Sequence, residues 1–147
     1  MTAIRARKFS TQVIRPATIG ATATLRVQLP LIGANFPEIL AAVPGTINLR
    51  LEQPLLVLFS DHRTAPIDWE NKGNYEKFDL LRSQLEIRGV KYEGWLYVAH
   101  GSPHRADLRN HEFIAQTKVP IGDDDSCILH ISRGCASVPY SPLVVVL

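Results

Sequence analysis

Short segments in which apolar and polar residues alternate constrain the fold of this chain more than any other feature. Residues 46–51 read Thr-Ile-Asn-Leu-Arg-Leu, which places Ile47, Leu49 and Leu51 on one face and the polar side chains on the other. This period of two is typical of a β-strand with one face in the core. Further strand candidates are Leu80–Arg88, Tyr92–Ala99, Phe113–Lys118 and Cys127–Ser132. Gly89 lies between the first two of these, where it favours a hairpin turn.

The segments before residue 46 extend this pattern and add one helix. Val13–Leu29 is rich in Thr, Val, Ile and Leu, and it predicts one or two strands. A short helix is expected after Asn35, with Pro37 in its first turn and Pro44 beyond its end. Many short strands separated by turns indicate a mainly β fold, and closure into a barrel removes exposed strand edges. We therefore expect a small closed six-stranded β-barrel with one short helix.

One segment shows neither the alternation of a strand nor the apolar spacing of a helix. Ser60–Lys77 contains proline, glycine, asparagine and many charged residues, and it predicts a long excursion over the surface. Loops of this length often carry functional residues.

Length and composition indicate a single domain over residues 1–147. The composition is 46% hydrophobic and 20% charged, which is typical of a globular protein with one core. Residues 1–37 carry five basic side chains and no acidic ones. We interpret residues 1–11 as a basic leader and residues 133–147 as a tail, both peripheral to the barrel. Because the basic residues are not clustered with aromatic ones, no nucleic-acid partner is expected.

Features of membrane and secreted proteins are missing from the sequence. No apolar run approaches the roughly 18 residues that a membrane-spanning helix needs, and the N-terminus lacks the apolar part of a secretory signal. An Arg-rich start without acids also resembles an organelle transit peptide, which stays an alternative. Two cysteines, Cys127 and Cys135, are too few for a disulfide scaffold or a zinc site. The expectation is a cytoplasmic protein without a membrane partner.

Common catalytic motifs are also missing. The sequence contains no P-loop, no G-x-G-x-x-G, no H-E-x-x-H and no G-x-S-x-G. The three acids at 123–125 lack the alternate spacing of a calcium-binding loop, so a solvated turn is favoured. These observations disfavour ordinary nucleotide-binding folds, zinc hydrolases and serine hydrolases.

Thr46 and Asn48 are the most specific candidates for a site. They share the polar face of one predicted strand, where a hydroxyl and an amide oxygen lie side by side. Both are hard oxygen donors, which complete a Mg²⁺ shell when phosphates and water supply the other ligands. These two residues alone are also compatible with a solvent-exposed strand face that binds no ligand.

The segment Pro44-Gly-Thr-Ile-Asn-Leu-Arg-Leu resembles the P-G-T-L-N-[LV]-[KR]-L signature of the archaeal CTP-dependent riboflavin kinases. Other blocks follow in the same order as in that family. They are Glu86-Ile-Arg-Gly-Val-Lys-Tyr-Glu-Gly-Trp, Ser102-Pro-His, His111-Glu-Phe-Ile-Ala and Asp123-Asp-Asp-Ser-Cys-Ile-Leu-His-Ile. The resemblance covers roughly residues 12–132, and the Gly-Thr-Ile-Asn block is its most specific part.

This resemblance implies a cradle-loop barrel that transfers the terminal phosphate of CTP to riboflavin with Mg²⁺, giving FMN and CDP. By the same resemblance, Thr46 and Asn48 would be metal ligands. Gly45 would let the chain approach the nucleotide, and Gly20 is the counterpart of a glycine-rich loop that lies against it. The residues on the flavin side would be Ser102, His104 and Glu112.

Two other functions stay open. A relative that has lost catalysis would keep the barrel and bind a nucleotide, a flavin or another small ligand. A structural domain would instead assemble through the C-terminal segment Leu143–Leu147, whose strand edge can pair with a second chain to form an oligomer.

Overall fold

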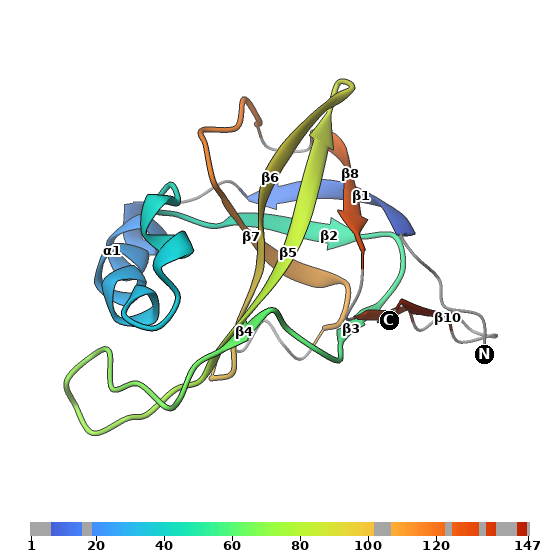
Figure 1. The fold of residues 1–147 in the computed structure, drawn as a ribbon. Coiled ribbons are helices and arrows are strands. Elements are labelled where there is room, and N and C mark those ends of the chain that lie inside the picture. Colours follow the sequence, from blue (N-terminus) through green and yellow to red (C-terminus); the bar gives the residue numbers. More distant parts are fainter. Residues whose placement is uncertain are drawn as a thin grey trace.

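A computed structural model describes residues 7–15, 19–101, 107–122, 125–132, 135–137 and 144–146. Within these residues the chain forms ten strands, one α-helix and one 3₁₀-helix (Figure 1). In chain order they are β1 (Arg7–Arg15), α1 (Ile19–Gly33), η1 (Pro37–Ala41), β2 (Ile47–Leu51), β3 (Leu55–Val57), β4 (His62–Arg63), β5 (Phe78–Ile87), β6 (Val90–Ala99), β7 (Asn110–Ala115), β8 (Ser126–Ile131), β9 (Cys135–Ser137) and β10 (Val144–Val146).

Most strands belong to one antiparallel sheet that curls into a barrel-like shape. Its order is β4-β5-β6-β7-β2-β1-β8, and β8 also pairs with β5 from Ser83↔Ile131 to Glu86↔Ile128. A mainly β fold was predicted, and this is confirmed. Arg88 and Gly89 connect β5 to β6 with φ angles of 49° and 80°, as a tight hairpin turn requires.

A second, smaller sheet has the order β10-β9-β3. Strands β9 and β10 of this sheet come from residues 133–147, the segment that we interpreted as a peripheral tail. Residues 7–11, assigned above to a leader, form the first part of β1, which lies between β2 and β8. These parts of both terminal segments therefore contribute strands to the fold.

Helix α1 is the main difference from the sequence-based prediction. Strands were expected over Val13–Leu29, but β1 ends at Arg15 and the chain is helical from Ile19. Leu25, Leu29 and Ile32 follow a helical spacing and are at most 5% exposed. Burial of this stripe against the sheet outweighs the β-propensity of the threonines and valines. The shorter helix predicted after Asn35 is present as η1.

Two apolar layers pack against opposite faces of the sheet. The inner layer fills the curl of the sheet and includes Leu49, Leu96 and Phe113, all fully buried. The outer layer lies between the sheet and α1 with η1, and Trp95 and Ile114 belong to it. The alternation predicted for residues 46–51 is confirmed, because the odd-numbered side chains point inward and Arg50 is exposed. In the described part of the chain, no helix is long and apolar enough to cross a bilayer.

Candidate functional site

The structure brings together Thr46, Asn48 and Glu112, three residues that the sequence singled out in two distant segments. Strands β2 and β7 are antiparallel neighbours, and Asn48 lies opposite Glu112 in their register. Thr46 directly precedes β2, and its Oγ1 donates a hydrogen bond to Glu112 Oε1 at 3.1 Å. A hydroxyl, an amide and a carboxylate therefore gather on the outer face of the sheet.

Thr46 and Glu112 line a cavity of about 320 Å³ between α1 and the sheet. Tyr97 reaches across it from β6, and its hydroxyl donates a hydrogen bond to Gln28 Oε1 of α1 at 2.5 Å. The described lining contains Glu70, Glu76 and Glu112 but no Lys or Arg. Burial, followed by the negative charges of Glu112 and Glu76, raises the pKa of Tyr97 above its ordinary value.

Gly45 precedes this site in a conformation that suits glycine. Its φ is 132°, a region that residues with a Cβ rarely adopt. Gly45 lines a separate groove of about 190 Å³ together with Thr117 and Lys118, whereas Thr46 lines the cavity under α1. Gly45 and Thr46, which are consecutive in the chain, thus border two separate hollows.

Of the three remaining predicted site residues, only Gly20 lies in the described part of the chain. Gly20 lies in the first turn of α1, where a loop was expected. Ser102 and His104 lie outside the described residues.

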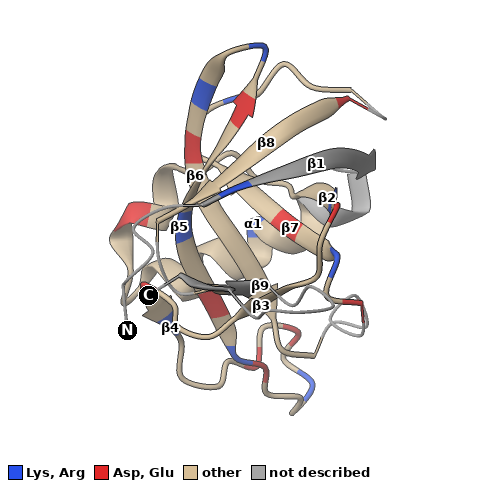
Figure 2. Cartoon of the chain, turned by 90° about the vertical axis from the view of Figure 1, so that its right-hand side faces the viewer, with Lys and Arg blue, Asp and Glu red and all other residues tan. Residues whose placement is uncertain are grey.

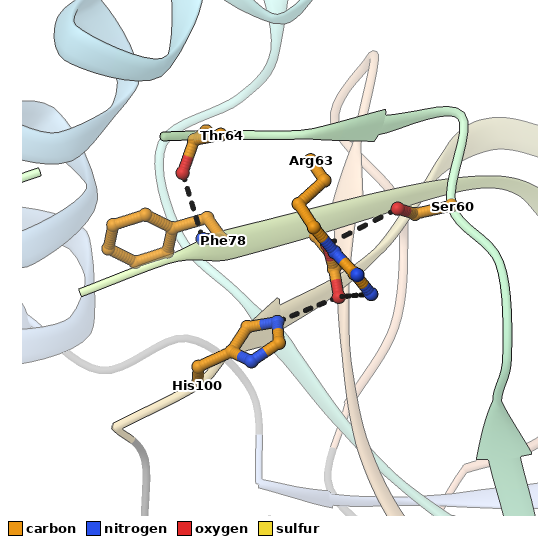
Figure 3. Close-up of polar contacts among 6 residues, drawn as sticks. Ser60, Arg63, Thr64, Phe78 and His100 are labelled. Atoms are coloured by element: carbon orange, nitrogen blue, oxygen red, sulfur yellow. Dashed lines mark hydrogen bonds and ion pairs between the residues drawn. The ribbon is translucent and has the colours of Figure 1, made fainter. Parts of the chain in front are cut away.

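A second polar cluster, which the sequence did not single out, surrounds Asp79 of β5 (Figure 3). Arg63 of β4 donates two hydrogen bonds, from Nε to Oδ1 at 2.6 Å and from Nη2 to Oδ2 at 3.0 Å. Ser60 donates another at 3.2 Å, and His100 Nε2 lies 2.7 Å from Oδ2. Thr64 ties the β4 segment to β5 by accepting a hydrogen bond from the backbone N–H of Phe78 at 3.0 Å.

The Asp79 carboxylate is held in its ionised form. Its side chain is only 5% exposed, and this burial alone would raise its pKa. Hydrogen bonds and charge from Arg63 and His100 more than offset burial, so that the pKa lies below its ordinary 3.8. No short motif unites these residues, because they come from three separate segments. The one available signal was the position of Ser60 and Arg63 in the long unpatterned stretch.

Three members of this cluster, Arg63, Asp79 and His100, line a cleft of about 120 Å³. The cleft and the Thr46 cavity share Tyr97, Ala99 and Glu112 as lining residues, but Asp79 belongs to the inner face of the sheet and the Thr46 cavity lies on its outer face. His111 also lines the cleft, where burial lowers its pKa although Nε2 lies 2.7 Å from the carbonyl oxygen of Leu108.

No protein-family model matches the sequence, and a search of curated proteins finds no match.

The oxygen donors of the first cluster suit a hard cation. Thr46, Asn48 and Glu112 offer hydroxyl, amide and carboxylate oxygens, the ligand types that Mg²⁺ prefers. Among the described residues, no three His, Cys, Asp or Glu side chains are grouped closely enough to hold a metal. This donor set therefore fits an ion that takes most of its ligands from phosphate and water, as Mg²⁺ commonly does.

Proposed function

We propose that this protein is a riboflavin-kinase-like transferase that moves the terminal phosphoryl group of CTP to riboflavin, giving FMN and CDP. One observation carries this proposal. Thr46, Asn48 and Glu112 belong to two sequence blocks that resemble the archaeal CTP-dependent riboflavin kinases, and in the fold Thr46 and Glu112 line one cavity while Asn48 lies opposite Glu112.

The cavity supports phosphoryl transfer by its chemistry. Such a reaction needs positioned reactants and neutralised charge rather than a covalent intermediate with the protein. Thr46 and Asn48 would hold Mg²⁺, which when bound offsets the negative charge of the donor phosphates. The carboxylates of the described lining would repel a phosphate chain without such an ion, so we infer a strict dependence on the cation.

Gly45 and Glu112 have complementary roles in this proposal. Gly45 lets the donor approach the backbone between the groove and the cavity. Glu112 lines the cavity, where its carboxylate can accept a hydrogen bond from the acceptor. We further propose that the curled sheet is a closed six-stranded barrel of the cradle-loop type, and the pairing of β8 with β5 supports this.

A second candidate is a barrel that binds a nucleotide or flavin without catalysis. The position of Gly20 within α1 favours it, because the glycine-rich loop that would lie against the nucleotide has no counterpart at this residue.

One experiment separates the two candidates. Purified protein is incubated with riboflavin and CTP, ATP or GTP, with and without Mg²⁺, and FMN is detected by chromatography. Thermal shift measurements with each ligand run in parallel, since a ligand at 100 times its Kd stabilises by about 2.7 kcal/mol. FMN formation that requires Mg²⁺ supports the kinase. Binding without FMN formation supports the second candidate.

A further inference from the structure

Trp69 forms an aromatic wall of the Thr46 cavity. It lies in the excursion over residues 60–77, and its side chain lines the cavity together with Thr46 and Tyr97. Trp69 is partly buried and packs against the outer apolar layer, which helps to fix the position of the indole. Trp95, the second tryptophan of the chain, lines neither this cavity nor the Asp79 cleft. Trp69 is therefore the tryptophan placed to meet a ligand in the cavity.

The chain holds Trp69 in a short closed ribbon, which projects past β4 (Figure 1). Ile67 and Glu76 form an antiparallel bridge with two backbone hydrogen bonds of 2.9 Å. Asp68, next to Trp69, accepts hydrogen bonds from the backbone N–H groups of residues 72 and 73 at 3.0 and 2.7 Å. Because the ribbon is ordered by these contacts, a ligand that binds Trp69 has less conformational entropy to remove than in a loose loop.

The charge of the cavity selects among aromatic ligands. Its described lining carries Glu70, Glu76 and Glu112 and no Lys or Arg. Lys72 lies 3.9 Å from Glu70, and the loops at the bottom of Figure 2 show charges of both signs on the ribbon. Negative charge thus dominates inside the cavity rather than on the ribbon as a whole. This disfavours an anionic ring and favours a planar ring whose N–H group a carboxylate can accept.

A flavin ring meets these requirements. It is flat and uncharged at neutral pH, and it carries a ring N–H between two carbonyl groups. The face of an indole stacks well on such a ring. The cytosine ring of CTP is also flat, but the proposed donor approaches at Gly45, which lines the separate groove rather than this cavity. The aromatic wall of the cavity is therefore assigned to the acceptor.

We propose that Trp69 binds the acceptor by stacking on its flavin ring, with Asp68 as the residue that positions the ribbon; this deepens the proposed function and rests on it. Glu76 accepts the hydrogen bond of the ring N–H. Trp69 makes and breaks no covalent bond, so it contributes affinity for a planar acceptor rather than chemistry at the phosphorus.

The test compares Trp69→Leu, Trp69→Phe and Asp68→Ala with the wild type and the control Tyr75→Leu. Tyr75 belongs to the same ribbon and is 70% exposed, but it lines neither the cavity nor the cleft. The measurements are the Kd of riboflavin by fluorescence titration, the Kd of CTP with Mg²⁺, FMN formation, and urea unfolding to verify folding.

We expect Trp69→Leu to raise the Kd of riboflavin by about 5–150-fold, as the loss of one aromatic stacking partner does, and to leave the Kd of CTP unchanged. Trp69→Phe keeps a flat face, so its Kd for riboflavin should lie between those of the wild type and Trp69→Leu. Asp68→Ala should also weaken riboflavin binding, because the ribbon loses two hydrogen bonds. Tyr75→Leu should bind both ligands as the wild type does.

A second measurement uses the wild type itself. The chain has two tryptophans and so gives two indole N–H signals in an NMR spectrum, which the spectrum of Trp69→Phe assigns. Stacking places Trp69 in the ring current of the flavin. Saturating riboflavin should therefore shift the Trp69 signal far more than the Trp95 signal.

The outcomes separate this inference from the proposed function. If the wild type makes FMN and folded Trp69→Leu binds riboflavin as tightly, Trp69 is not in the acceptor site, and the proposed function stands. If Trp69→Leu weakens CTP binding at least as much as riboflavin binding, the inference is overturned as well. If the wild type neither binds riboflavin nor makes FMN, both fall.

Riboflavin binding that Trp69→Leu weakens as expected, without FMN formation by the wild type, supports the stacking role together with the second candidate function. Should Trp69→Leu not fold, an unshifted Trp69 indole signal in the wild type at saturating riboflavin overturns the inference.

Discussion

Thr46 donates a hydrogen bond to Glu112 at 3.1 Å across 66 positions of the chain. Thr46 is 2% exposed, yet its side chain borders a cavity rather than the apolar core. The pair joins the segment most similar to the riboflavin kinase signature to the strand expected to face the acceptor. Substitutions at this pair therefore test both the proposed site and the stability of the fold.

Thr46→Ala and Asn48→Ala are each expected to abolish FMN formation. Both remove an oxygen donor from the proposed Mg²⁺ site, which misplaces the ion and the donor phosphates. Thr46→Ala should also cost about 0.5–1.5 kcal/mol of unfolding free energy, because the hydrogen bond to Glu112 is lost. Thr46→Ser keeps the hydroxyl and should retain activity. The measurements are chromatography of FMN and urea denaturation; full activity in either alanine variant would show that the metal site lies elsewhere.

Glu112→Gln is expected to weaken riboflavin binding while changing stability by no more than about 0.5 kcal/mol. The amide still accepts the hydrogen bond from Thr46, but the negative charge is lost. Because that charge raises the pKa of Tyr97, the variant should also bring the alkaline titration of Tyr97 to lower pH. Flavin fluorescence titration measures the first effect and ultraviolet absorbance the second. Unaltered riboflavin affinity would remove Glu112 from the acceptor site.

Leu49 and Arg50 test the orientation of β2. Leu49 is fully buried in the inner layer, and Leu49→Ala should cost about 2–5 kcal/mol of stability. Arg50→Ala should change stability little, since its partners Asp107 and Asn110 form exposed contacts with it. Ile47→Asp, which places an unpaired charge against the inner layer, should unfold the domain. Urea denaturation of all three variants checks the orientation, and equal losses for Leu49→Ala and Arg50→Ala would contradict it.

Tyr97→Phe tests the contact between α1 and the sheet. Loss of the hydroxyl leaves the buried Gln28 side chain without its donor, at an expected cost of about 1–3 kcal/mol. The folded pKa of Tyr97 lies above its ordinary value of 10.0, so the wild type favours the neutral phenol below that pH and loses stability as pH rises above it. Urea unfolding between pH 8 and about 11 should show this alkaline loss in the wild type and a smaller one in Tyr97→Phe. An identical pH dependence in both proteins would argue against a buried phenol.

The sequence by itself determined features that depend on neighbouring residues. The alternation over residues 46–51 set which face of β2 is buried, because side chains on a strand point to opposite faces in turn. Gly89 marked the β5–β6 hairpin, where two successive residues take positive φ. The short helix after Asn35 was predicted on the same local grounds.

The tertiary structure decided what depends on distant partners. Residues 19–29 became part of α1 because the sheet presents an apolar face that a helical stripe can cover, and burial of that stripe is stronger than local β-propensity. The pairing of β8 with β5 and the meeting of Thr46 with Glu112 depend on how the strands curl, which no local pattern specifies. The Asp79 cluster likewise draws Arg63 and His100 from separate segments. A carboxylate is stable in that buried position only once the folded chain has brought these partners to it.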